Sequence, residues 1–126
     1  MRVVVATVLI LVIFLVGAFM INKYVNNACG RLLEDVGELD RSIKGENWAR
    51  GREHVQNLKK QWEMTKKGWL LFLEHYETDP IDISLTRLEQ YVEVENKALA
   101  SGEMAELRLL IDSVRSKENF KLENIL

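Results

Sequence analysis

The chain has 126 residues, and 17 lysines and arginines against 19 aspartates and glutamates give it a formal net charge of −2. Domains that bind nucleic acid usually carry a clear basic excess, so we expect no nucleic-acid partner. A single cysteine, Cys29, excludes an internal disulfide and a cysteine-based zinc cluster. One proline and seven glycines in the whole chain favour long helices over a turn-rich sheet.

An unbroken apolar run extends from Val3 to Ile21 without a charged side chain. A helix of this length, at about 1.5 Å per residue, reaches about 28 Å, which is close to the hydrocarbon thickness of a bilayer. We therefore predict a transmembrane signal-anchor helix over residues 1–22, in contact with the lipid bilayer through residues 3–21. Residues 23–126 are predicted to form a helical-bundle domain.

The apolar run has two alternative interpretations, a cleaved signal peptide and a lipoprotein signal. Val16-Gly17-Ala18 offers small residues for signal-peptide cleavage, but the apolar run continues beyond them. Cys29 lies eight residues past the run and follows polar residues, which disfavours a lipoprotein. The basic residues flanking the run are nearly balanced, so the positive-inside rule is weak here. Because a very short tail before a signal-like run usually stays in the cytoplasm, we predict a single-pass protein of the cell membrane with an extracytoplasmic bundle.

Apolar positions continue at helical spacing beyond the anchor, and no proline intervenes. This pattern predicts one helix from the bilayer to about Ile43, with Gly45 past its end and Asn47 as the N-cap of the next helix. The positions are Val25, Ala28, Cys29, Leu32, Val36, Leu39 and Ile43.

A seven-residue spacing marks the next segment. Large side chains at these positions, with further apolar or small ones three residues after them, predict a helix whose seam packs in a bundle core. The alternative is that the tryptophans stack on a ligand. The first set is Trp48, Val55, Trp62, Trp69 and Tyr76, and the second is Leu58, Thr65 and Phe72.

Asp79-Pro80 predicts the start of a third helix, with Asp79 as N-cap and Pro80 in the first helical position. Its seam is predicted to run from Ile81 through Leu85, Leu88 and Val92 to Glu95 and Leu99. Ser101-Gly102 indicates a break. A last helix is predicted from Met104 through Leu107, Ile111 and Val114 to about residues 117–119, followed by an extended segment over residues 120–126 that packs on the bundle.

These segments predict an all-α fold, in which an N-terminal transmembrane helix is continuous with an antiparallel up-down bundle of about four helices. Basic side chains gather between residues 50 and 67 and acidic ones between residues 74 and 106. The bundle would set Arg52, Lys59 and Lys66 beside the third helix near Asp82 and Glu89. The alternative is a basic strip that meets anionic lipid or an acidic partner. Glu95 would reach the bundle edge or pair with a base of the second helix.

His75, Glu77 and Asp79 are weak candidates for a metal site, because they converge only if the chain is extended or turning there. On a helix, steps of two residues rotate the side chains by about 200°. We expect no catalytic and no cofactor-binding residue. The predicted function is a non-enzymatic protein-interaction or scaffold module that binds a protein partner or forms a homodimer. The alternative is an extracytoplasmic ligand or metal sensor that uses the His75–Asp79 segment.

A set of residues spread from position 48 to position 126 resembles the pattern of a known family. The set is Trp48-Ala49, Trp62, Trp69, the run His75-x-Glu77-x-Asp79-x-Ile81, Leu88, Tyr91 and the closing Leu122-x-Asn124-Ile125-Leu126. By these residues the chain resembles domain of unknown function 4363, a bacterial family of short proteins, from the apolar segment to its end. The resemblance implies a membrane-anchored helical protein of Gram-positive, spore-forming bacteria without an assigned activity.

Overall fold

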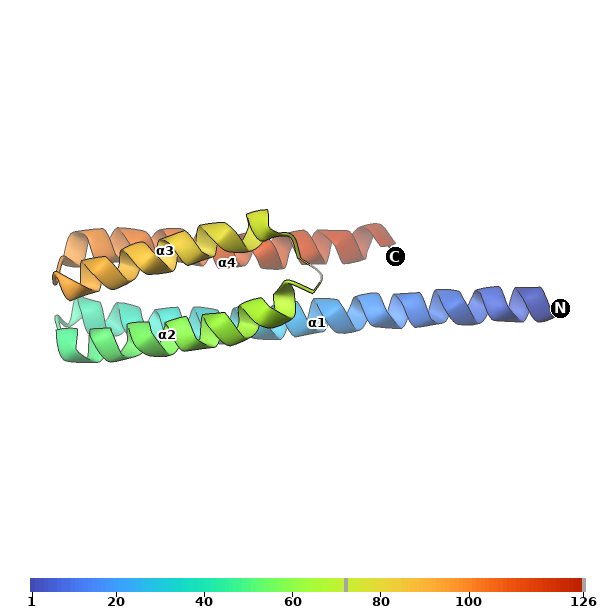
Figure 1. Cartoon of the computed structure of the whole chain (residues 1–126), viewed down its shortest axis with the longest axis horizontal. Coiled ribbons are helices and arrows are strands. Elements are labelled where there is room, and N and C mark those ends of the chain that lie inside the picture. Colours follow the sequence, from blue (N-terminus) through green and yellow to red (C-terminus); the bar gives the residue numbers. More distant parts are fainter. Residues whose placement is uncertain (72, 126) are drawn as a thin grey trace.

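A computed structural model describes residues 1–71 and 73–125, and these residues form four helices and no strand. The helices are α1 (Arg2–Lys44), α2 (Trp48–Trp69), α3 (His75–Glu93) and α4 (Lys97–Ile125). Each of α1 and α3 packs against both α2 and α4, so the four helices form an antiparallel up-down bundle (Figure 1). The predicted all-α fold and the continuity of the first helix with the bundle are confirmed.

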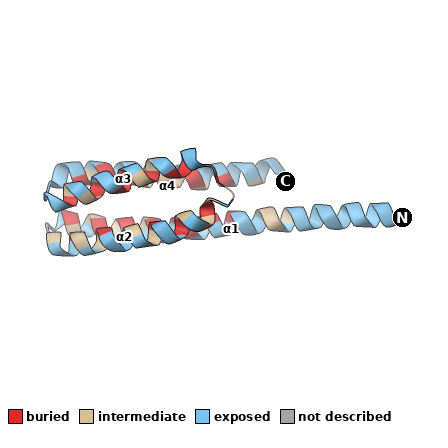
Figure 2. Cartoon of the chain, in the orientation of Figure 1, coloured by how far each residue is buried: buried red, intermediate tan, exposed pale blue. Residues whose placement is uncertain are grey.

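The core of the bundle begins part-way along α1. Buried side chains follow α1 from Val25 to Ile43 at steps of three and four residues, which is one face of a helix. Matching stripes on the other three helices face them, and the first half of α1 is exposed (Figure 2). The largest fully buried side chains include Trp62, Trp69, Leu32, Leu39, Ile43, Leu58, Ile81, Leu88, Met104, Leu107 and Ile111.

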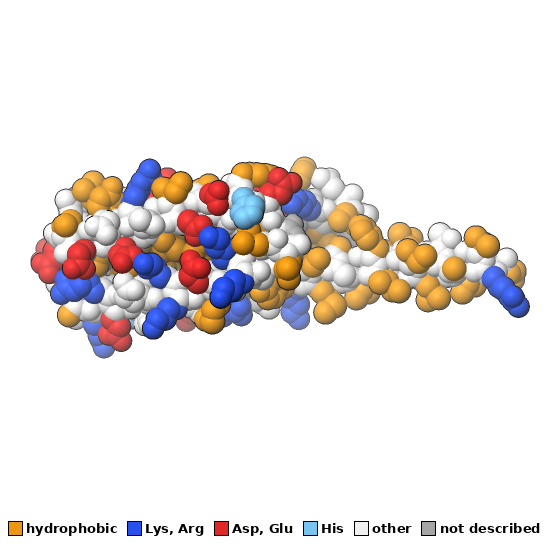
Figure 3. Space-filling view, viewed as in Figure 1, with side chains coloured by type: hydrophobic (Ala, Val, Ile, Leu, Met, Phe, Trp, Pro, Cys, Tyr) orange, Lys and Arg blue, Asp and Glu red, His pale blue; other side chains and the backbone are white. Residues whose placement is uncertain are grey.

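The first half of α1 projects from the bundle as a stalk, which we define as residues 2–21. It is covered with apolar side chains, whereas charged side chains are mixed over the bundle (Figure 3). Within the described residues, α1 is the helix that is long and apolar enough to cross a membrane by length and composition. No residue of its most hydrophobic 18-residue window is buried in the protein.

Two turns at the end of the bundle far from the stalk have the same construction. Glu46 and Glu95 both have a left-handed backbone, with φ of 56° and 57°. Each is followed by an asparagine whose side-chain oxygen accepts a hydrogen bond from the backbone three residues on. Asn47 thus caps α2, as predicted, and Asn96 caps α4.

The connection between α2 and α3 differs from the prediction. Helix α2 ends at Trp69, and Tyr76 belongs to α3, where 64% of its surface is exposed. Glu74 is the N-cap of α3, so the prediction of Asp79 as N-cap was wrong and Pro80 lies inside the helix. Pro80 is the sixth residue of α3, beyond the first turn, so the helix lacks the backbone hydrogen bond that an N–H at this position would donate to the Tyr76 carbonyl oxygen. Phe72 lies outside the described residues.

Helix α4 also differs from the prediction. It begins at Lys97 and continues without a break through Ser101-Gly102 to Ile125. Residues 120–125 are therefore helical, and the prediction of an extended segment there was wrong. Glu95 and Leu99 are not in the core: Glu95 lies in the turn before α4, and Leu99 is 49% exposed. The helix persists because Ala100, Met104 and Leu107 give it a buried stripe across the glycine. A helical glycine costs only about 1 kcal/mol.

Candidate functional site at the stalk end of the bundle

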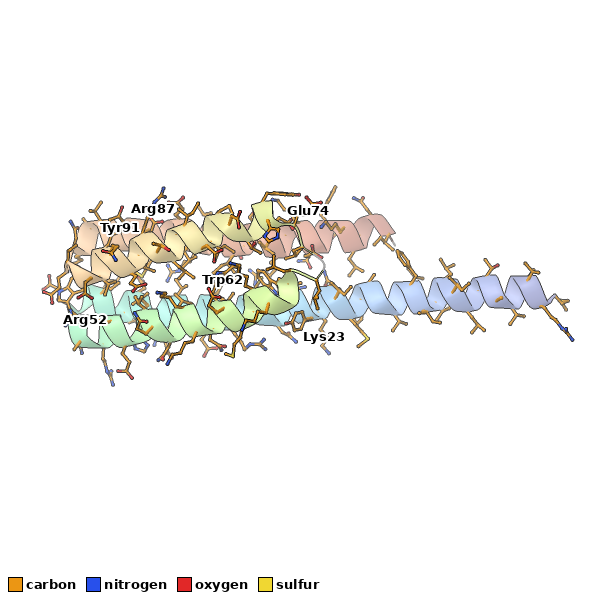
Figure 4. The ribbon with its side chains drawn as sticks, in the orientation of Figure 1. Lys23, Arg52, Trp62, Glu74, Arg87 and Tyr91 are labelled. Atoms are coloured by element: carbon orange, nitrogen blue, oxygen red, sulfur yellow. The ribbon has the colours of Figure 1, made fainter. Side chains whose placement is uncertain are left out.

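Helix α2 ends, α3 begins and α4 passes where the stalk enters the bundle, and we call this region the stalk end. Helix α4 reaches it at Asn119, whose side chain contacts Asn22 of α1. Helix α2 reaches it at Gly68, where an added Cβ atom would collide with the Tyr24 hydroxyl. The start of α3 lies beside α4, with Lys117 Nζ 5.7 Å from the centroid of the Tyr76 ring. The stalk end therefore gathers residues from all four helices (Figure 4).

Three asparagines join α1 to α4 at this level. The Asn22 and Asn26 side-chain amides each donate to Asn119 Oδ1 over 3.0 Å, and the Asn26 amide also donates to Asn22 Oδ1 over 2.9 Å. Asn22 is 9% exposed, so its polar side chain needs these partners. We refer to the three residues as the asparagine cluster.

A groove of about 370 Å³ runs along the stalk next to the asparagine cluster. One wall is the stalk itself, and the other is the end of α4, whose Leu122 and Ile125 continue the apolar stripe beyond the core. Its polar groups are concentrated toward the bundle. The groove is lined by Ile13, Phe14, Gly17, Ala18, Ile21, Asn22, Glu118, Lys121, Leu122 and Ile125.

Lys121 and Glu118 form the charged part of the groove. Lys121 Nζ donates to Glu118 Oε1 over 3.1 Å, and the Glu118 side chain is nearly buried. Burial alone would lower the pKa of Lys121, but the hydrogen bond to Glu118, with the nearby charges of Glu118 and Glu77, raises it above the ordinary lysine value. Lys121 is therefore held as a cation at the edge of an apolar groove.

The outer surface of the stalk end combines exposed apolar side chains with lysines. Leu71 is 86% exposed, Tyr76 64% and Phe120 63%. Such large apolar side chains are singly common on protein surfaces, but here they gather at one end of the bundle. Exposed lysines at the same end are Lys23, Lys67, Lys117 and Lys121, and exposed acids there are Glu74 and Glu123.

The structure does not bring the three predicted metal-ligand candidates together. All three lie on α3: His75 and Asp79 are exposed, whereas Glu77 is 7% exposed and faces inward. In residues 1–71 and 73–125, no group of three or more histidine, cysteine, aspartate or glutamate side chains is placed to hold a metal ion. Glu77 instead lies in the first turn of α3, where a carboxylate is favoured by the helix dipole.

The tryptophans are part of the core. Trp62 and Trp69 are at most 1% exposed, and their rings meet edge to face with centroids 5.4 Å apart. Trp62 Nε1 donates to Asp82 Oδ1 over 2.6 Å, which ties α2 to α3. Because both rings are enclosed by protein, the alternative of stacking on a ligand has no support in this geometry.

Basic residues of α2 pair with acidic residues of α3, as predicted from the charge asymmetry of the sequence. Lys66 Nζ lies 2.6 Å from Asp82 Oδ2, and Lys59 pairs with Glu89. The hydrogen bond from Lys59 lowers the pKa of Glu89, and the hydrogen bond to Asp82 raises the pKa of Lys66. Arg52 Nη1 lies 3.1 Å from Glu95 Oε1, so the prediction that Glu95 pairs with a base of the second helix is confirmed.

Cys29 lies in the core, as its place on the apolar face of α1 predicted. Its thiol is fully buried and donates to the Ile111 carbonyl oxygen over 3.7 Å. Burial raises the pKa of the thiol to about 12. A protonated, enclosed thiol is unreactive, so Cys29 does not supply a nucleophile or an intermolecular disulfide in the folded protein.

Sequence reasoning missed the asparagine cluster and the exposed end of α4. One signal was present: Asn22 and Asn26 are one helical turn apart, directly after the apolar run. Their partner Asn119 is 97 residues away from Asn22 and was assigned to the end of a helix that in fact continues. Local sequence cannot reveal such a pairing.

No curated protein and no solved structure matches the chain. One family model does, and its description is Domain of unknown function (DUF4363). The match covers residues 19–125, which is the end of the stalk and almost all of the bundle. The chain therefore belongs to the DUF4363 family.

Proposed function

We propose that this protein is a single-pass membrane protein whose bundle acts outside the cytoplasm as a non-enzymatic interaction module. The observation that carries the proposal is the construction of α1. Its first half is apolar and entirely unburied, and its second half supplies one side of the bundle core. An isolated helix of that composition is unfavourable in water, so a bilayer is its natural environment.

The anchor continues into the bundle as one helix, without a flexible linker between them. Because α1 is helical from Arg2 to Lys44, the bundle has a set distance from the membrane and a set orientation. The asparagine cluster reinforces this by joining α4 to α1 at the junction. A rigidly mounted bundle suits a scaffold that presents its outer faces to a partner or to a second copy of the chain.

The outer faces of α3 and α4 offer apolar contact points to a protein partner. Ile83 is 52% exposed and Leu109 is 71% exposed. The non-enzymatic part of the proposal is supported by how the reactive side chains are used: Cys29 is enclosed, and Asp82 and Glu89 are engaged in ion pairs between helices. The dispersed positions of His75, Glu77 and Asp79 give no support to the sensor alternative.

Cysteine labelling in intact cells tests the membrane orientation. Native Cys29 cannot report it, because it is buried, so Val94→Cys is introduced into a Cys29→Ala background. Val94 is 69% exposed in the turn before α4, far from the stalk. A membrane-impermeant maleimide should label it without lysis. Labelling that requires lysis would contradict the extracytoplasmic placement.

Photo-crosslinking of the full-length protein in its own cells tests the interaction role. A photoreactive phenylalanine at position 109 should give one discrete adduct, whose mass identifies a homodimer or a second protein. The same residue at position 57, an exposed polar site on α2, is the matched control. If position 109, and likewise position 83, yields no adduct beyond that control, the interaction role is wrong.

A further inference from the structure

We propose that the stalk end of the bundle is itself seated in the interfacial layer of the bilayer, through the turn after α2 and the end of α4. This inference rests on the proposed function in one respect, namely that the stalk spans the membrane. It adds two further membrane contacts, from segments that no hydrophobicity pattern identifies as membrane-associated. The bundle would then lie against the lipid instead of above it.

The end of α4 extends along the stalk past the end of the apolar run. The apolar run ends at Ile21, and Asn119 is bonded to Asn22, the next residue. Helix α4 runs antiparallel to α1 and continues for six residues beyond Asn119. At about 1.5 Å per residue, this places its last turn about 9 Å further along the stalk. The groove lining agrees, because Leu122 and Ile125 line the same groove as Gly17 and Ala18 of the stalk.

The turn after α2 reaches a similar level beside α1. Gly68 lies against Tyr24, two residues past Asn22, and α2 is directed toward the stalk. The chain then continues through Leu70 to Leu71, which exposes 86% of its surface. The described residues leave most of this leucine uncovered, and interfacial lipid would bury it favourably.

The composition of the stalk end is that of an interfacial surface. Phe120 projects from α4 on the side away from the core, and Tyr76 projects from the first turn of α3. Aromatic rings favour the headgroup level, and lysines there extend their charges toward phosphates. Lys117 lies over the Tyr76 ring, and Lys23 and Lys67 are exposed nearby. The exposed acids Glu74 and Glu123 limit the depth to the headgroup layer.

Depth-dependent fluorescence quenching tests this placement in the full-length protein. In a Cys29→Ala background, an NBD label is attached to Leu71→Cys or to Phe120→Cys. The protein is reconstituted in vesicles of phosphatidylcholine and phosphatidylglycerol, with or without brominated acyl chains. Val94→Cys is the matched control, because it is an equally apolar and exposed site at the opposite end. Val12→Cys, in the middle of the stalk, reports the span itself.

We expect brominated lipid to quench the labels at positions 71 and 120 at least half as strongly as the label at position 12, and to leave position 94 unquenched. If position 12 is quenched but 71 and 120 are not, the interfacial placement is overturned while the span stands. If position 12 is unquenched, the membrane anchor itself fails. Labels at 71 and 120 that are shielded from aqueous iodide yet unquenched by lipid would assign this surface to a protein partner, which also overturns the placement.

Discussion

The side-chain amide of Asn22 donates a hydrogen bond to the side-chain oxygen of Asn119 over 3.0 Å. This bond connects the residue that follows the apolar run to a residue in the last two turns of α4. With the bond that the Asn26 amide donates to the same oxygen, it joins the end of α4 to α1 where the stalk enters the bundle.

Substitution of Asn119 by alanine should loosen this attachment. The variant removes the acceptor of two hydrogen bonds, so we expect the free energy of unfolding to fall by about 1 kcal/mol. Chemical denaturation in detergent, followed by far-ultraviolet circular dichroism, measures the change. Asn124→Ala, at an exposed position on the same helix, is the control and should leave stability unchanged. Equal losses in both variants would show that the asparagine cluster contributes nothing specific.

The two left-handed glutamates offer a paired test. A left-handed backbone costs an L-residue about 1 kcal/mol and costs glycine almost nothing, so Glu46→Gly should raise the free energy of unfolding by about 0.5 kcal/mol. Glu95→Gly should gain less, because it also loses the ion pair with Arg52. Thermal denaturation compares the two. A loss of stability in Glu46→Gly would contradict the strained geometry of this turn.

The Cys29 thiol should resist alkylation in the folded protein. Burial and a pKa of about 12 keep it protonated and enclosed near neutral pH. A maleimide should therefore modify it only after denaturation, whereas Leu109→Cys in a Cys29→Ala background should react at once. The unfolded thiol, with a pKa of 9.0, loses its proton first, so stability should fall as the pH rises above 9.0. Rapid labelling of native Cys29 would contradict its burial.

Glu89 should contribute an acid-sensitive part of the stability. Its hydrogen bond from Lys59 lowers its pKa in the folded state, so its contribution is present above the ordinary value of 4.5 and is lost as the pH falls through the folded pKa. Because the pair is partly exposed, we expect Glu89→Gln to cost about 0–1 kcal/mol near neutral pH and nothing in strong acid. Denaturation curves recorded from neutral pH to strong acid measure how this cost changes. Glu93→Gln, at an exposed position at the end of α3, is the control, and its effect on the free energy of unfolding should not change with pH.

Glu103 is a buried carboxylate with an imperfect partner. It is 7% exposed, Arg87 Nη1 lies 4.0 Å from its Oε1, and that oxygen accepts no hydrogen bond from the described residues. Replacing such a charge by an apolar side chain of similar size is often neutral or stabilising. We expect Glu103→Leu to raise the free energy of unfolding by about 1 kcal/mol. The exposed Glu106→Leu should have no effect, and destabilisation of Glu103→Leu would show that the ion pair matters.

Much of the bundle could be predicted because its signals are local. The helical spacing from Val25 to Ile43, the cap at Asn47 and the complementary charges of Lys66 and Asp82 each involve residues within a few helical turns or on helices joined by a short connection. The residues at which α2 ends and α3 begins could not be predicted. The seven-residue spacing continues from Trp69 to Tyr76 although the chain reverses between them, and no glycine or proline lies between these two residues.

The sequence by itself determined the all-α class, the apolar stalk and its continuity with the bundle, because a hydrophobic run and a 3.6-residue period are properties of one helix. Only the tertiary structure decided what lies beside the stalk. Leu122 and Ile125 line a groove with residues of the stalk, and Asn119 meets Asn22 because α1 and α4 are antiparallel. Such contacts join residues from opposite ends of the chain, and a helical period carries no information about its partner.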